Sequence, residues 1–377
     1  MKVIFIGQLG VRVGSPGQKT PREERIINLG RALAQRGHRV TVVTTKPYSN
    51  PTLRNYYGIT FVPKASFDRE YPGGWLYVIL SLLTLWRQQP DVAHLHGWRT
   101  ASLAWLAALL SPETTFIWTV DALPQHFPLA ARLVARQAGR VCDVMTTPTR
   151  TLQYLLLQHY NLRAAYIPDG YTRQLLKDIP LASLGLGLRK EQYCLLLASE
   201  VTTIRAALRA YATTKSRKKL VIVAEPTAAW ERLINRKSFV HFIGKKYGRQ
   251  LRTLVRQAAC VIATEDTPNL EVLLQAMDSG RSIIAANISL YQELLGVTAQ
   301  FYRSKRRNEL SGLLQATIKR RSFQRAWGAT ARQRARHHFT WERVLPEYLA
   351  AYRYREVVVV PLDSVQLVAL PRPVRVQ

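Results

Sequence analysis

The sequence predicts an α/β protein with two doubly wound parallel sheets, one in each half of the chain, and a cleft between them. Apolar runs rich in β-branched residues alternate with helical patterns along nearly the whole chain. These runs are apolar throughout, which is typical of parallel strands covered by helices on both faces. A looser stretch at residues 171–192 separates a first series of strands from a second.

The first half begins with an apolar segment at residues 3–7, which predicts a buried strand and not a secretory signal. A loop with Gly10, Gly14 and Gly17 follows, and then a helix that ends near Gly37. Further strands of this half are expected at residues 39–44, 59–62, 92–96, 115–120, 144–147 and 164–168.

The second half repeats the pattern, with strands expected at residues 195–198, 220–224, 240–243, 261–264 and 283–286. Helices are expected at residues 308–319 and from 323 to about 338, and Thr340 is a candidate N-cap for a last one. We therefore predict a first domain at 1–170, a second at 171–338, a last helix at 339–356, and a tail at 357–377.

The net charge and the cysteine content of the chain limit which classes of function it fits. The chain has 54 Lys and Arg against 24 Asp and Glu, a formal net charge of +30, and residues 310–340 contain no carboxylate. Such a field attracts polyanions, whether nucleic acid, anionic lipid or phosphorylated small molecules. The three cysteines show no CxxC pairing, which argues against a disulfide scaffold or a structural zinc site and suits a reducing cytosol.

One apolar stretch, residues 75–86, is too short to span a bilayer before Arg87. We expect it to be a helix buried against the first sheet. The alternative is a helix that acts together with the basic surface at an anionic membrane.

The clearest local signal follows the strand at 261–264. Thr267 can cap a helix, Pro268 suits the first helical position and Gly280 suits the stop. Because this helix would start at the strand-end cleft, its free N–H groups and dipole predict an anion site for a phosphate. A routine strand-to-helix turn would have the same residues.

A second signal is the segment from Asp91 to Trp98, where His94 and His96 would share one face of a strand. A histidine there can contact a sugar hydroxyl or a phosphate, although a buried histidine with a backbone partner is the commoner case. The glycines at 10, 14 and 17 form neither a GxGxxG fingerprint nor a P-loop. Their pattern argues against a dehydrogenase and against an NTPase.

In order along the chain, these segments resemble the motifs of bacterial family 4 glycosyltransferases, which have the GT-B fold of two Rossmann-like domains. The resemblance covers about residues 1–355. It is carried by Arg36–Val42 ("RGHxVTV"), Tyr57-Gly58-Ile59, Asp91–Gly97, Ile167-Pro168-Asp169-Gly170, Phe242-Ile243-Gly244, the run from Gln275 to Gly280 ("EAMAxG") with Glu293 after it, and Phe339-Thr340-Trp341.

The resemblance implies a retaining hexosyltransferase with a nucleotide-sugar donor on the second domain and an acceptor on the first, with no metal and no cofactor. It implies that the last helix, at 339–356, crosses back to the first domain. It also implies His96 and Asp121 as catalytic residues. The donor-binding residues that it implies, together with their local substitutes, are Gly14, Gly17, Arg205, Gly244, Glu265, Thr267, Glu271 and Gln275.

The departures from the family pattern fall on donor contacts. Thr267 and Gln275 stand where the family has its two carboxylates, and Glu265 and Glu271 lie nearby. Ser199 replaces the arginine that holds the donor phosphate, and Arg205 is a candidate for its lysine. Trp118 stands where the family's histidine maps, with Asp121 close by. Each charge-assisted contact that is lost is worth about 1.5–3 kcal/mol.

Two main hypotheses therefore stand. The first is an active glycosyltransferase in cell-envelope or glycoconjugate synthesis, cytoplasmic or peripheral on the inner membrane face, with a phosphorylated or lipid-linked acceptor. The second is a catalytically degenerate GT-B protein that serves as a binding or assembly partner. A basic polyanion-binding protein is a third reading, but no recognition motif supports nucleic acid as the partner.

Overall fold

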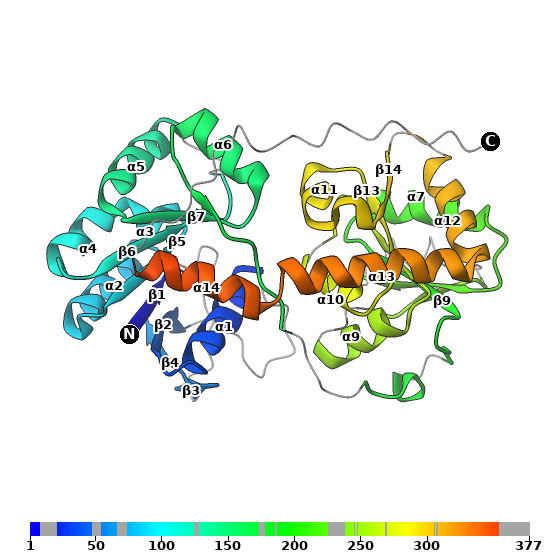
Figure 1. Ribbon diagram of the computed structural model, residues 1–377, viewed down its shortest axis with the longest axis horizontal. Coiled ribbons are helices and arrows are strands. Elements are labelled where there is room, and N and C mark those ends of the chain that lie inside the picture. Colours follow the sequence, from blue (N-terminus) through cyan, green and yellow to red (C-terminus); the bar gives the residue numbers. More distant parts are fainter. Residues whose placement is uncertain are drawn as a thin grey trace.

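The structure of the protein is a computed structural model. It describes residues 1–7, 21–46, 54–65, 74–123, 128–172, 178–184, 187–224, 238–244, 246, 248–267, 270–304, 306 and 308–353. Two sheets define two α/β domains that lie end to end along the long axis (Figure 1). The predicted fold class is confirmed.

The first domain is built on an eight-stranded sheet in the order β3-β4-β2-β1-β5-β6-β7-β8. All neighbouring strands pair in parallel except β3 and β4, which form an antiparallel pair. The strands are β1 (Lys2–Ile6), β2 (Arg39–Thr45), β3 (Asn55–Tyr56), β4 (Ile59–Lys64), β5 (Val92–His96), β6 (Thr115–Thr119), β7 (Val144–Thr147) and β8 (Ala165–Tyr166).

Two helical layers cover this sheet. One layer packs on one face with a shared hydrophobic core, and consists of α2 (Trp75–Gln88), α3 (Trp98–Ser102), α4 (Ala104–Leu110), α5 (Pro128–Val141) and α6 (Arg150–Tyr160). On the other face α1 (Pro21–Ala34) and the last helix, α14 (Trp341–Tyr352), form a second core. The continuous apolar strands of the sequence follow from this double covering.

The second domain has a six-stranded, all-parallel sheet in the order β11-β10-β9-β12-β13-β14. Its strands are β9 (Tyr193–Leu197), β10 (Lys219–Val223), β11 (Val240–Phe242), β12 (Cys260–Ala263), β13 (Ser282–Ala286) and β14 (Gln300–Tyr302). Around it lie η2 (Leu181–Leu184), α7 (Val201–Ala212), α9 (Gly248–Gln257), α10 (Leu270–Asp278), α11 (Ser289–Leu295), η3 (Gly296–Thr298), α12 (Glu309–Lys319) and α13 (Arg321–His338).

Two chain segments cross between the domains side by side. The amide of Tyr171 donates to the carbonyl of Phe339 at 2.7 Å, and Tyr171 also pairs with Thr340 in a parallel bridge. A Cβ on Gly170 would lie 2.6 Å from the ring of Trp341, so only glycine fits this close approach. From this crossing the chain passes from α13 in the second domain to α14, which packs on the first (Figure 1).

The strands expected from the sequence are present, and the short strands β3 and β14 are additional. The helix over residues 75–86 does pack its inner side on the first sheet, but its outer side exposes large apolar residues, so the expectation of a buried helix is only half right. No helix in the described part of the chain is long and apolar enough to cross a bilayer. The tail at 357–377 lies outside the described residues.

Candidate active site

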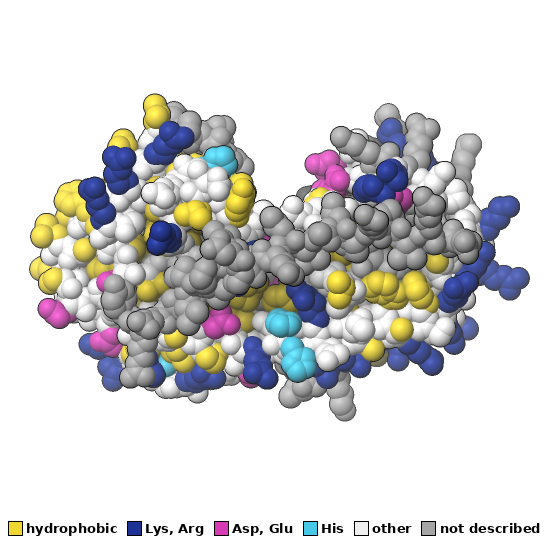
Figure 2. Space-filling view, turned by 45° about the horizontal axis from the view of Figure 1, so that its top comes forward, with side chains coloured by type: hydrophobic (Ala, Val, Ile, Leu, Met, Phe, Trp, Pro, Cys, Tyr) yellow, Lys and Arg dark blue, Asp and Glu magenta, His cyan; other side chains and the backbone are white. Residues whose placement is uncertain are grey.

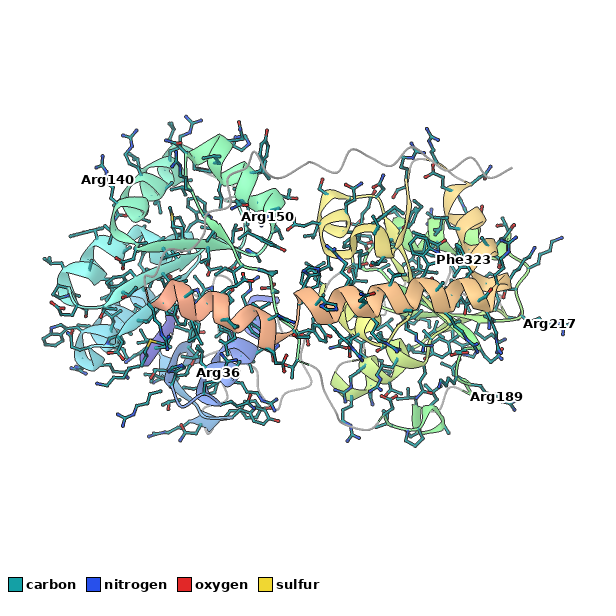
Figure 3. All side chains as sticks on the ribbon, in the orientation of Figure 1. Arg36, Arg140, Arg150, Arg189, Arg217 and Phe323 are labelled. Atoms are coloured by element: carbon teal, nitrogen blue, oxygen red, sulfur yellow. The ribbon has the colours of Figure 1, made fainter. Side chains whose placement is uncertain are left out.

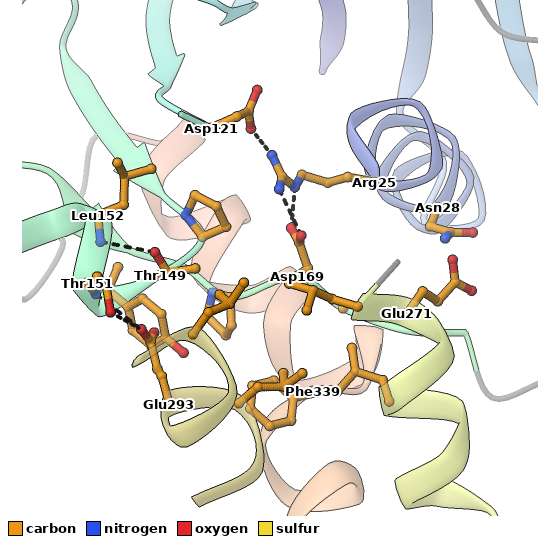
Figure 4. A pocket seen from close by; sticks show the side chains of 18 of the residues that line it. Arg25, Asn28, Asp121, Thr149, Thr151, Leu152, Asp169, Glu271, Glu293 and Phe339 are labelled. Carbon is orange, nitrogen blue, oxygen red and sulfur yellow. Dashed lines mark hydrogen bonds and ion pairs between the residues drawn. The ribbon is translucent and has the colours of Figure 1, made fainter. Parts of the chain in front are cut away.

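A cavity of about 750 Å³ lies between the two domains (Figure 4). Residues that follow strands of the first sheet line one side of it, among them Asp121 and Asp169. From the second domain, Leu270 and Glu271 at the start of α10 line the other side. The start of the helix after β12 therefore faces the interdomain cavity, as the sequence predicts. Pro268 itself lies outside the described residues.

The centre of the cavity wall is a buried ionic cluster. The guanidinium of Arg25, on α1, donates to Asp121 and to both carboxylate oxygens of Asp169, with Nη2 at 2.8 Å from Oδ2 (Figure 4). Burial acts to lower the pKa of Arg25, but Asp169 and Asp121 outweigh burial, so the pKa is raised and the guanidinium stays charged. One cation thus orients two carboxylates at the cavity.

Asp121 lies close to His96 as well as to Arg25. Its Oδ2 lies 3.8 Å from Nδ1 of His96, the last residue of β5, which is longer than a hydrogen bond. His96 is fully buried and does not line the described cavity, whereas Asp121 does. The two residues that the resemblance implies as catalytic are therefore neighbours, with Asp121 at the cavity and His96 behind it.

His94 and His96 share one face of β5, as predicted, because their ring centroids stack 4.4 Å apart. His94 belongs to a buried hydrogen-bonded chain. Its Nδ1 lies 2.8 Å from the hydroxyl of Tyr352 and its Nε2 lies 2.6 Å from that of Thr119, which in turn contacts Thr146. This chain joins α14 to the sheet, so the role of His94 is structural.

The burial of His94 predicts a pH dependence of stability. Burial, and then the charge of His96, lower the pKa of His94 well below its usual value of about 6.5. Below about pH 6.5 the unfolded chain binds a proton at this residue that the folded protein does not, so stability falls by up to about 1.4 kcal/mol per pH unit. We expect urea unfolding of His94→Gln to show a shallower loss of stability toward acid than the wild type.

The control is His159→Gln, because His159 is exposed at the end of α6. That variant should keep the slope of the wild type. Equal slopes in the wild type and in His94→Gln would show that other groups cause the acid sensitivity.

Glu265 and Glu271, which the sequence offers as alternative donor-binding residues near the start of α10, lie in different surroundings. Glu271 lines the cavity and points toward Asn28 of α1 (Figure 4), and Nε2 of Gln275 donates to its Oε1 at 3.1 Å. Glu265 is exposed and accepts instead from the hydroxyl of Ser304 at 2.7 Å. Glu271 is therefore the carboxylate that a bound ligand would meet, and Gln275 positions it.

Thr267 and Ser199, which replace charged family residues, are engaged elsewhere. The hydroxyl of Thr267 donates to the carbonyl of Leu197 at the end of β9. The amide of Ser199 donates to Asp266 at 2.5 Å, and the amide of Glu200 donates to the same carboxylate. The N–H groups just before α7 therefore already hold an anion, the side chain of Asp266.

The pKa of Asp266 agrees with this contact. Partial burial acts to raise it, but hydrogen bonds from Thr264 and from the Glu200 and Ser199 amides outweigh burial and lower the pKa.

Other predicted donor-binding residues do not line the described cavity. Arg205 is exposed on α7 and Gly244 follows β11, and neither lines the described cavity. Gly14 and Gly17 lie outside the described residues.

Glu293 connects the two domains across the cavity. It lies on α11 of the second domain, and its carboxylate accepts from the amides of Arg150 and Thr151 at 2.5 and 3.1 Å, at the start of α6 of the first domain (Figure 4). A carboxylate is stabilised at a helix N-terminus by the free N–H groups and the helix dipole. Glu293 therefore acts as an interdomain helix cap in this structure.

Sequence reasoning missed Arg25 and Asn28 as site residues, and quoted Asp169 only as part of a motif. A usable signal existed for Asp169, since it follows a strand as Asp121 does, and the carboxyl ends of parallel strands meet at one edge. No spacing indicates Arg25. Trp118 lies within β6, fully buried in the core, so Asp121 and not Trp118 holds the cavity position at the end of this strand.

Comparison with known proteins finds a similarity that covers most of the first domain. Residues 23–175 match the family model described as Glycosyltransferase Family 4. This part of the first domain is therefore similar to the family 4 glycosyltransferases, as the order of the motifs indicates. The match covers most of α1, the elements from β2 to β8 and both aspartates of the ionic cluster. No curated protein matches the sequence.

Similarity to solved structures extends beyond residues 23–175. A sucrose-phosphate synthase from Thermosynechococcus elongatus is 17% identical, with a TM-score of 0.73 over 93% of this chain and 98% of that one. The Anabaena protein HepE in complex with UDP and glucose is 16% identical, with a TM-score of 0.72 over 94% and 99%. A trehalose-phosphate synthase from Burkholderia xenovorans in complex with glucose-6-phosphate is 12% identical, with a TM-score of 0.69 over 94% and 100%. Together they show that the whole chain has the GT-B fold.

Proposed function

We propose that this protein transfers a sugar from a nucleotide-sugar donor to an acceptor, with retention of anomeric configuration, in the cavity between its two domains. The observation that carries the proposal is the cavity itself. Its volume of about 750 Å³ suits a ligand of this size, and residues of the first domain and of the second domain line it together. A reaction between a donor on one domain and an acceptor on the other needs such a shared space.

The polar groups of the cavity suit a sugar. Glu271, positioned by Gln275, offers a carboxylate to sugar hydroxyls, and Asn28 faces it from the first domain. Hydrogen bonds from hydroxyls to a carboxylate are shorter and stronger than neutral ones. We assign Glu271 to the donor sugar in place of the carboxylate that Thr267 and Gln275 do not supply.

The diphosphate of the donor needs positive polarity. Arg25 is the only Lys or Arg among the described residues that line the cavity, and its guanidinium is already held by two aspartates. The start of α10 at Leu270 supplies N–H groups and the positive end of a helix dipole. We therefore assign the leaving diphosphate to this helix start, where charge that develops in the transition state is stabilised.

Asp121 is the residue of the first domain best placed to contact the reacting groups, with His96 behind it as a positioning residue. Among the comparison structures, one was solved with UDP and glucose and another with glucose-6-phosphate. By analogy we propose a nucleotide-sugar as donor and a phosphorylated or lipid-linked molecule as acceptor. That the reaction needs neither a metal nor a cofactor stays a prediction.

The assignment of Glu271 gives a matched pair of variants. We expect Glu271→Ala to weaken nucleotide-sugar binding and turnover by about ten- to a hundredfold, because a charge-assisted hydrogen bond is worth about 1.5–3 kcal/mol. Glu265→Ala removes the same group from an exposed site outside the described cavity lining, so it should change neither. Calorimetry and product formation with a panel of nucleotide-sugars measure both effects.

The same panel tests the function itself. A wild type that binds and turns over none of the nucleotide-sugars would overturn the proposal and favour the alternative hypothesis of a catalytically degenerate GT-B protein. Equal losses in Glu265→Ala and Glu271→Ala would remove the assignment of Glu271 but not the function. The anomeric configuration of the product, read by NMR, decides between retention and inversion.

A further inference from the structure

The outer face of one helical layer is apolar to an unusual degree. On α2, one stripe of side chains points away from the sheet and is exposed: Trp75, Ile79, Leu83 and Trp86. Trp75 is 55% exposed and Trp86 is 50% exposed. Their spacing of four, four and three residues places them along a single side of the helix.

Two neighbouring helices continue this face. On α4, Trp105 and Leu109 are exposed, and on α5, Leu129 and Leu133 are exposed, with Leu129 at 74%. The inner sides of α2, α4 and α5 share one core on the same face of the sheet, so their outer sides point the same way. We call the eight residues the apolar face: Trp75, Ile79, Leu83, Trp86, Trp105, Leu109, Leu129 and Leu133.

Arginines accompany the apolar face. Arg132, Arg136 and Arg140 are exposed along α5, four residues apart, and Arg87 follows Trp86 at the end of α2. Figure 2 shows hydrophobic side chains at the left end of the molecule, with Lys and Arg beside them and Asp or Glu at their lower edge, and Figure 3 shows Arg140 extending outward from α5.

Carboxylates are absent from all five helices of this layer, α2 to α6. The nearest acidic residues along the chain, Asp91, Glu113 and Asp143, lie in the turns just before β5, β6 and β7. The five helices therefore carry apolar and cationic side chains but no carboxylate, and the acidic residues come only in the turns at the edge of the layer.

This combination identifies the occupant. Soluble proteins seldom expose a contiguous apolar face of several large residues without a partner for it. Tryptophan prefers the boundary between water and lipid, and arginines beside an apolar face are attracted to anionic headgroups. We propose that the apolar face and Arg132, Arg136 and Arg140 dock the protein onto an anionic lipid surface. The inference rests on this surface alone and not on the proposed function.

The docking is peripheral. The apolar side chains enter the boundary between headgroups and acyl chains, while the helices lie along the surface, as amphipathic elements do. The arginines supply an attraction that salt screens. The affinity should therefore depend on both lipid charge and apolar side chains, which distinguishes docking from the general attraction of a basic protein to anions.

The experiment is co-sedimentation of the full chain with vesicles of phosphatidylcholine alone and of equimolar phosphatidylcholine and phosphatidylglycerol. We expect binding to the anionic vesicles only. Arg132→Gln with Arg136→Gln and Arg140→Gln should weaken it by roughly a hundredfold, at about 1 kcal/mol per arginine. Trp75→Ser with Ile79→Ser, Leu83→Ser and Trp86→Ser should weaken it at least tenfold.

The matched control removes the same charge elsewhere. Arg320, Arg321 and Arg325 are exposed at the start of α13 in the second domain, and their combined replacement by Gln should leave binding unchanged. Circular dichroism confirms that each variant is folded. Equal weakening in this control, or full binding by the serine variant, would overturn the proposal. So would a wild type that binds no vesicle, or one that self-associates through the apolar face, as shown by light scattering.

Discussion

Replacement of Arg25 by Met is expected to lower the free energy of unfolding by about 3–5 kcal/mol, because it leaves two carboxylates facing each other without their cation. Arg25 is almost completely buried and joins Asp121 to Asp169, which follow two different strands. Methionine fills a similar volume, so lost charge and not lost packing causes the effect. Urea unfolding of the wild type and the variant measures it.

Two further variants test the cause. If the uncompensated charge is responsible, adding Asp121→Asn and Asp169→Asn to Arg25→Met should restore most of the stability. Arg303→Gln is the surface control. It breaks a pair with Glu309 whose arginine side chain is 43% exposed, so it should lower stability far less than Arg25→Met does. An Arg25→Met variant as stable as the wild type would mean that the cluster does not hold the cavity wall.

Replacement of Trp118 by Ala is expected to cost about 3–5 kcal/mol of folding free energy. The side chain is fully buried on β6, and its ring meets that of Trp98 edge to face with centroids 5.1 Å apart. The loss therefore includes transfer of a large apolar surface, a cavity in the core and an aromatic pair. Thermal unfolding of the full-length protein measures this change in stability.

Trp105→Ala provides the matched control, because it deletes the same side chain from an exposed position on α4. It should change stability by less than about 0.5 kcal/mol. If both tryptophan variants were equally stable, Trp118 would have to lie outside the core, and its position could then belong to the active site after all.

The strands of both sheets could be predicted because their signal is local. Apolar runs such as the one that forms β9 are buried from end to end and are bounded by polar turns. The short strands β3 and β14 could not be found in this way. They have two and three residues, which is too short for a pattern to develop, and only the pairing of each with a neighbouring strand shows it.

The candidate site was predictable in part. That the start of the helix after β12 faces the interdomain cavity followed from the rule that ligand sites lie beyond the carboxyl ends of parallel strands. The same rule did not predict which of the two glutamates lines the cavity. Glu265 and Glu271 lie six residues apart on a turn and a helix, and the contacts with Ser304 and Gln275 decide their directions.

By itself, the sequence determined the two-sheet α/β architecture and the resemblance to family 4 glycosyltransferases, because hydrophobic periodicity and motif order are properties of neighbouring residues. Only the tertiary structure decided that Arg25 joins Asp121 and Asp169, that Glu293 caps a helix of the other domain, and that one helical layer exposes three of its tryptophans. The reason is physical: these contacts join positions far apart along the chain, and the order of strands and the packing of helices, not spacing in the sequence, bring them together.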